Sequence, residues 1–141
     1  MPQHIPYTTG LVYLHIIHNA ITENVAVDDA KAQLCAGAKA IALTITEAGS
    51  VNNRSGVFVV SVSIDGGATF YTYAMLMSNV ANSNAQTPIR VASLTRASAG
   101  TDVLFFDPAT LGAITHFKVS VTITDTDSPA GTFTVKAAIK Y

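Results

Sequence analysis

The chain has 141 residues, of which 49% are hydrophobic and only 12% are charged, and its formal net charge is −1. The eight basic residues do not cluster, which excludes the basic surface of a nucleic-acid-binding protein and the polybasic segment that attracts a protein to a membrane. Ordinary globular domains carry about 25% charged residues. The deficit therefore indicates a surface rich in Thr, Ser and Asn, or a surface covered by a partner.

The first ten residues, Met1 to Gly10, contain two prolines and are predicted to form an extended arm. The arm lacks the basic and apolar segments of a signal peptide. The apolar stretch that follows, Leu11 to Ile17, is interrupted by His15 and is far shorter than the roughly 20 residues of a membrane span. We expect residues 11–141 to form one domain, made in the cytoplasm and not in contact with a membrane.

The segment from Leu11 to Ile21 is predicted to be mainly a strand, with Val12, Leu14 and Ile16 on one face. This segment also contains His15 and His18. A helix would place the two rings on one face, whereas a strand with this odd spacing places them on opposite faces. The strand is favoured, so a shared metal site is not expected here.

The best helical candidate runs from Asp28 to Cys35, because it begins with Asp, continues with good helix formers and ends before Gly37. A turn or a further strand edge is the alternative. Cys35 is the single cysteine of the chain, so no intrachain disulfide can form. It is expected to be a small buried hydrophobic residue in a protein made in a reducing compartment.

Four longer stretches alternate apolar and polar residues with the period of two that is typical of a strand with one buried face. Their apolar sets are Ile41, Leu43 and Ile45; Phe58, Val60, Val62 and Ile64; Phe117, Val119, Val121 and Ile123; and Phe133, Val135, Ala137, Ile139 and Tyr141. Shorter extended segments are predicted at Phe70–Leu76, Ile89–Leu94 and Asp102–Phe106, with a turn from Asp107 to Gly112. The pattern predicts an all-β fold, a single-domain antiparallel β-sandwich of jelly-roll-like or Ig-like type.

A tight hairpin is predicted around Asp65, where glycines supply the positive φ that such turns require. The local sequence SIDGGATF resembles the Asp-box signature, S-x-D-x-G-x-T-W/F, of sialidases and many β-sandwich proteins. The matching residues are Ser63, Asp65, Gly66, Gly67, Thr69 and Phe70. Sialidases repeat this box once per propeller blade, whereas this chain has one copy. The resemblance therefore implies a structural hairpin and not sialidase activity.

Other candidate chemistry is sparse. The acidic turns Asp28-Asp29 and Asp125-Thr126-Asp127 offer oxygen ligands for Ca²⁺, but they lack further spaced carboxylates and are expected to be ordinary turns. No nucleophile motif, phosphate loop or dinucleotide fingerprint is present in the sequence. A hydrolase would need His15 or His116 beside an acid and a nucleophile. We expect neither an enzyme nor a cofactor.

Two tyrosines offer a different function. Tyr71 and Tyr73 share a strand face directly after the hairpin and would form an aromatic platform for a surface glycan if both were exposed. The alternative is that tyrosine is simply favoured in strands. The glycan-binding module is kept as the second hypothesis.

The chain resembles the small β-rich virion proteins of tailed phages, in particular head-decoration (cement) proteins. The resemblance rests on size, the proline-containing arm, Thr/Ala/Val-rich strands, the Asp-box-like hairpin and the single cysteine. It implies a homotrimer that binds the major capsid protein on the capsid exterior; a tail or neck subunit shares the same features. The predicted contact residues are Pro2, His4, Ile5, Pro6 and Tyr7 in the arm, and Asn82, Asn84 and Gln86 in the polar loop Ser78–Pro88.

Overall fold

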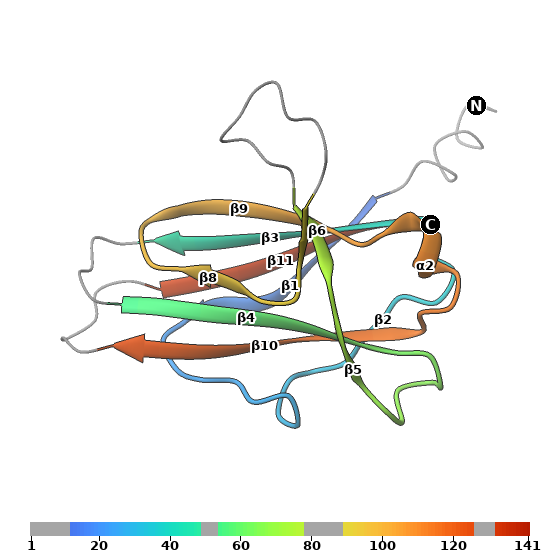
Figure 1. Cartoon of the computed structure of the whole chain (residues 1–141), viewed down its shortest axis with the longest axis horizontal. Helices are drawn as coiled ribbons and strands as arrows, with labels where there is room; N and C mark the ends of the chain where they lie inside the picture. Colours follow the sequence, from blue (N-terminus) through green and yellow to red (C-terminus); the bar gives the residue numbers. More distant parts are fainter. Residues whose placement is uncertain (1–11, 49–53, 78–88, 126–131) are drawn as a thin grey trace, which may run out of the picture.

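The computed structural model describes residues 12–48, 54–77, 89–125 and 132–141, which form two packed antiparallel sheets (Figure 1). Sheet A has the order β1 (Val12–Ile21), β11 (Thr132–Lys140), β3 (Ala40–Ala48), β9 (Gly100–Phe105), β6 (Met75–Met77) and β7 (Ile89–Val91). Sheet B has the order β2 (Gln33–Leu34), β10 (His116–Asp125), β4 (Arg54–Ser63) and β5 (Tyr71–Tyr73), and β8 (Leu94–Arg96) also pairs with β4. The expected all-β sandwich is therefore confirmed.

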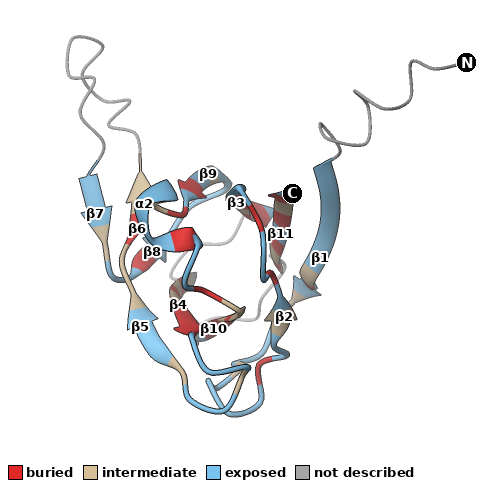
Figure 2. Ribbon diagram, turned by 90° about the vertical axis from the view of Figure 1, so that its right-hand side faces the viewer, coloured by how far each residue is buried: buried red, intermediate tan, exposed pale blue. Residues whose placement is uncertain are grey.

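The core lies between the sheets, where the apolar sets of the long strands meet (Figure 2). Along β3 the buried and half-exposed positions alternate as the sequence predicts, and β10 and β11 repeat this pattern. Two expected members lie outside the core. Ile64 is exposed because β4 ends at Ser63, and Tyr141 is exposed because it follows the end of β11.

The last strand is not at an edge. β11 pairs with both β1 and β3, so Lys136 and Lys140 lie on an inner strand of sheet A. The edges of sheet A are β1 and the three-residue β7.

Two segments that were expected to be single strands each cross from one sheet to the other. The extended stretch Phe70–Leu76 divides at Ala74 into β5, which pairs with β4, and β6, which pairs with β9. Residues 89–96 divide in the same way into β7 in sheet A and β8 in sheet B. Local periodicity does not reveal such a crossing, because both halves are extended.

The predicted helix at Asp28–Cys35 is wrong. Its backbone instead forms a turn, in which Ala30 N–H donates to the carbonyl of Ala26, and then strand β2 along the edge of β10. An eight-residue helix is marginal by itself, so hydrogen bonds to a sheet edge outweigh its propensity. The helix found in the described residues is α2 (Pro108–Leu111), at the predicted turn, where the Asp107 side chain caps Ala109 N–H.

The expected placement of His15 and His18 on opposite faces is also wrong. The register pairs His15 with Ala137 and His18 with Val135, with a shift after Ile16. Both partners belong to the buried face of β11, so the bulge turns the two histidines to the same side of the strand. His18 is buried and its Nε2 donates to the carbonyl of Val119 in sheet B at 2.7 Å, whereas His15 is exposed.

Candidate interaction surface

The outer face of sheet A carries a row of apolar side chains that crosses five strands. The strand registers place these residues directly opposite one another, in the order Leu14, Ala138, Ala42, Phe105 and Leu76. Residues on this side of the sheet alternate with the buried ones, so the row faces away from the core. We call this set of five residues the apolar row.

Because two alanines lie between larger side chains, the apolar row encloses a groove of about 440 Å³. Its lining includes Ala42, Ala138, Phe105 and Leu76 of the row, and also Val12 and Lys140. Leu14, at the end of the row, has 79% of its surface exposed, and Phe105 has 43%. Large apolar side chains that are contiguous and exposed mark interaction surfaces, whereas scattered ones do not.

Two lysines flank the apolar row. Lys136 and Lys140 lie on either side of Ala138 along β11, whereas Arg90, opposite Leu76 on β7, forms an ion pair with Asp107 at 2.6 Å. The outward positions of sheet A that the structure describes include no acidic residue, since Glu47 is buried and Asp102 lies opposite the buried Ile45. A partner with an apolar centre and an acidic rim would complement this surface.

The Asp-box-like hairpin is a structural device, as its sequence implies. Ser63 Oγ accepts from Gly67 N–H at 2.9 Å and donates to Asp65 Oδ1 at 2.7 Å, and the same Oδ1 accepts from Thr69 N–H at 2.9 Å. Gly66 and Gly67 have φ of 77° and 93°, which glycine adopts without strain. The side chains thus satisfy the backbone of the turn and fix its shape.

Hydrogen bonds from Ser63 and then Thr69 lower the pKa of Asp65 from its usual 3.8 to about 2. The folded protein therefore binds this proton less readily than the unfolded chain, so the stabilisation is present above pH 3.8 and is lost as pH falls toward 2. We expect Asp65→Asn to make the melting temperature less dependent on pH in that window. Thermal melts followed by circular dichroism measure this, with Asp28→Asn, an exposed acid outside the hairpin, as the control. Parallel pH curves for Asp65→Asn and wild type would contradict the expectation.

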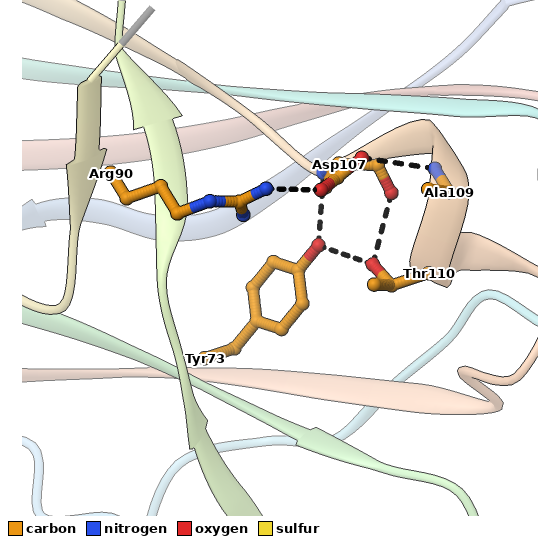
Figure 3. A network of polar contacts seen from close by, with 5 residues as sticks. All are labelled: Tyr73, Arg90, Asp107, Ala109 and Thr110. Carbon is orange, nitrogen blue, oxygen red and sulfur yellow. Dashed lines mark hydrogen bonds and ion pairs between the residues drawn. The ribbon is translucent and has the colours of Figure 1, made fainter.

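Tyr71 and Tyr73 do not form the exposed pair that a glycan platform needs. Tyr71 is 59% exposed, but Tyr73 is half-buried and its ring stacks on the core residue Phe106 with centroids 5.0 Å apart. The Tyr73 hydroxyl accepts from Asp107 N–H at 2.9 Å and contacts Thr110 Oγ1 at 2.6 Å (Figure 3). Tyr73 therefore packs against the core and holds the segment around Asp107 in place.

The same network ties both sheets to helix α2. Thr110 Oγ1 donates to the carbonyl of Asp107 at 2.9 Å and so accepts from Tyr73, while Arg90 of β7 binds Asp107 Oδ2 at 2.6 Å (Figure 3). This ion pair and the cap to Ala109 N–H lower the pKa of the Asp107 carboxyl. Every group of Asp107 thus has a structural partner here.

Two further candidates, Cys35 and His116, lie within the described residues. Cys35 is fully buried, and burial raises the pKa of its thiol to about 11, as expected of a small hydrophobic core residue. His116 lies beside Thr115, with its Nδ1 3.1 Å from Thr115 Oγ1. In the part of the chain that the structure describes, no group of three or more His, Cys, Asp or Glu side chains lies close enough to hold a metal.

Some predicted residues lie outside the described residues. These are the arm residues Pro2, His4, Ile5, Pro6 and Tyr7, the loop residues Asn82, Asn84 and Gln86, and the acid Asp127; of Asp125 only the backbone is described. The apolar row, by contrast, was missed by sequence reasoning. One feature of the sequence could have indicated the apolar row. In strand Ala40–Ala48 the residues that alternate with the buried Ile and Leu are Ala and Thr rather than charged residues.

Comparison of the chain with models of protein families and with curated protein sequences finds no match. Over the described ranges, no helix has both the length and the apolar character needed to cross a membrane.

Proposed function

We propose that this protein is a structural subunit of a phage virion, a capsid decoration protein that binds the outside of the head through the outer face of sheet A. The observation that carries the proposal is the apolar row, which crosses five strands of a chain with only 12% charged residues. An isolated subunit leaves these side chains in water, and docking would remove them from it. The identity of the assembly rests on the resemblance to decoration proteins.

The groove defines the chemistry of the contact. An apolar side chain of the major capsid protein would fill the space above Ala42 and Ala138, with acidic groups near Lys136 and Lys140. Burial of apolar area contributes about 25 cal/mol per Å², which is modest for one small contact. Many copies on one shell, and several subunits per attachment site, would add to the affinity through avidity. The resemblance implies three subunits per site.

The arm residues Pro2 to Tyr7 and the loop residues Asn82, Asn84 and Gln86 are proposed as further contacts with the shell or with neighbouring subunits. Extended segments commonly bind by adding a strand to an exposed sheet edge. A tail or neck subunit would use the same apolar surface, and electron microscopy of the bound particles separates the two locations by the symmetry of the added density.

The groove is tested by Ala42→Lys, which places a cation above its floor. We expect binding of the purified chain to heads assembled from the major capsid protein of the same genome to fall about tenfold or more, because a charge would be buried without a partner. Co-sedimentation measures the bound fraction.

Thr122→Lys is the matched control, because it adds the same charge at an exposed position of β10 in sheet B. It should bind the heads as the wild type does. Unchanged binding of Ala42→Lys would contradict the proposed surface, and failure of the wild-type chain to bind heads would contradict the proposed function.

A further inference from the structure

The edge of sheet A formed by β1 differs from the other sheet edges. Within the described residues, β7, β2 and β5 are edge strands of three residues or fewer, whereas β1 has ten. A long free edge exposes a row of backbone N–H and C=O groups that can pair with another strand. Short edges offer too few of these groups to do so.

Only the second half of β1 has an irregular backbone that discourages pairing with another strand. Register shifts occur after Ile16 and after His18, and Ala20 has a positive φ of 50°. Bulges of this kind bend and twist an edge strand and so discourage pairing. The first five residues, from Val12 to Ile16, pair with β11 in continuous register, without a bulge. We call these five residues the open edge.

The outward side of the open edge is apolar, and the open edge contains no Lys, Arg, Asp or Glu. Val12, Leu14 and Ile16 on its outward side are 50%, 79% and 62% exposed. The whole of β1 contains no Lys, Arg, Asp or Glu, although charged residues are a common protection of natural sheet edges. In Figure 2 β1 lies at the right-hand side of the molecule and is coloured mostly as exposed, and among the described strands its one neighbour in sheet A is β11.

We propose that two copies of this chain associate through their open edges, β1 against β1, across a two-fold axis. A strand can pair with itself in antiparallel orientation, which gives the self-complementary interface that a two-fold axis requires. Full overlap of the five residues pairs Leu14 with Leu14 of the second copy and Val12 with Ile16. The uncharged strand places no like charges opposite each other at the axis.

A second copy of the chain is better accommodated at the open edge than on the outer face of sheet A. Two copies stacked face to face through the apolar row would bring Lys136 and Lys140 of each close to those of the other, without acidic partners on that face of sheet A as described. Edge pairing leaves these lysines in water and joins the outward side chains of both β1 strands into one apolar stripe. It also leaves the groove accessible.

Light scattering of the full chain, from micromolar to sub-millimolar concentration, tests the pairing. We expect the wild type to approach about 29 kDa, twice the 14.7 kDa of one chain, and Leu14→Lys to remain a monomer at every concentration. Ile64→Lys is the matched control, since Ile64 is 61% exposed but lies in the hairpin, and it should dimerise as the wild type does. A wild-type monomer, or a dimer that Leu14→Lys leaves intact, would overturn the proposal. A wild-type trimer would also overturn it, and would instead support the homotrimer that the resemblance to decoration proteins implies.

A cysteine at the same position tests the register. Residues directly opposite in an antiparallel pair have Cα atoms about 4.5–5.5 Å apart, which a disulfide can bridge. Because Cys35 is fully buried, oxidised Leu14→Cys should run as a covalent dimer on a non-reducing gel and Ile64→Cys as a monomer. Equal cross-linking of both variants would refute the pairing. Neither measurement involves capsids, so this inference and the proposed function can fail separately.

Discussion

Replacing Phe106 by alanine is expected to lower the free energy of unfolding by about 3–5 kcal/mol, the range found when a buried aromatic ring is removed. Phe106 is 2% exposed. Its ring stacks on Tyr73 at 5.0 Å and meets Phe117 edge-on at 5.3 Å between centroids. The substitution removes the aromatic contacts and leaves a cavity that the packed core fills only in part.

The neighbours of Phe106 are held in place, which makes collapse of the cavity difficult. Tyr73 is fixed through its hydroxyl to Asp107 and Thr110, and Asp107 is fixed to Arg90. Chemical denaturation followed by circular dichroism gives the free energy, because the chain contains no Trp for fluorescence. A loss below about 1 kcal/mol would mean that the site relaxes, contrary to this description.

Phe105→Ala is the matched control for the same experiment, because Phe105 is the preceding residue and its ring lies on the outer face of sheet A. It is 43% exposed and pairs with Ala42 and Leu76. Its removal should cost about 1 kcal/mol or less and should weaken the binding of capsids in the co-sedimentation assay. Equal destabilisation by the two substitutions would show that the ring of Phe105 is not on the outer face of sheet A while that of Phe106 is in the core.

The strands and the core could be predicted from the sequence because a period of two is a local property. Ile41, Leu43 and Ile45 are buried as their alternation requires, and Phe117 and Phe133 likewise. The Asp-box hairpin was predicted for a similar reason. The side chains and backbone N–H groups that form the hydrogen bonds of its turn lie within seven residues, from Ser63 to Thr69. Each of these features is indicated by the spacing of residues that are near neighbours in the chain.

The apolar row could not be predicted, because it depends on the register of strands that are distant in sequence. Leu14 and Ala138 become neighbours only when β1 pairs with β11, and Ala42 joins them through β3. The bulge after Ile16, which turns His18 inward, likewise becomes visible only from the pairing. Tyr73 was proposed as a ligand contact because its strand face was known but its partner Phe106 was not.

The effect of adding one methyl group at Gly56 likewise depends on residues that are distant in sequence, and it could not be predicted from the sequence. Alanine normally stabilises a strand position occupied by glycine, because it restricts the unfolded chain. At Gly56 we expect the opposite sign, a loss of about 1–3 kcal/mol from overpacking. A Cβ atom there would lie 2.9 Å from two carbons of the Phe133 ring and 3.0 Å from Phe58.

Neither ring can move away freely, because Phe58 and Phe133 pack edge-on against each other at 5.4 Å and are 2% and 0% exposed. Gly112→Ala is the control, since Gly112 has φ −61°, compatible with alanine, and an added Cβ would meet no atom within 4 Å. Denaturation curves should therefore move in opposite directions, with Gly112→Ala gaining about 0.4–1 kcal/mol. Stabilisation by both substitutions would mean that the core beside Gly56 has room for a methyl group, and that the close packing of Phe58 and Phe133 does not require glycine.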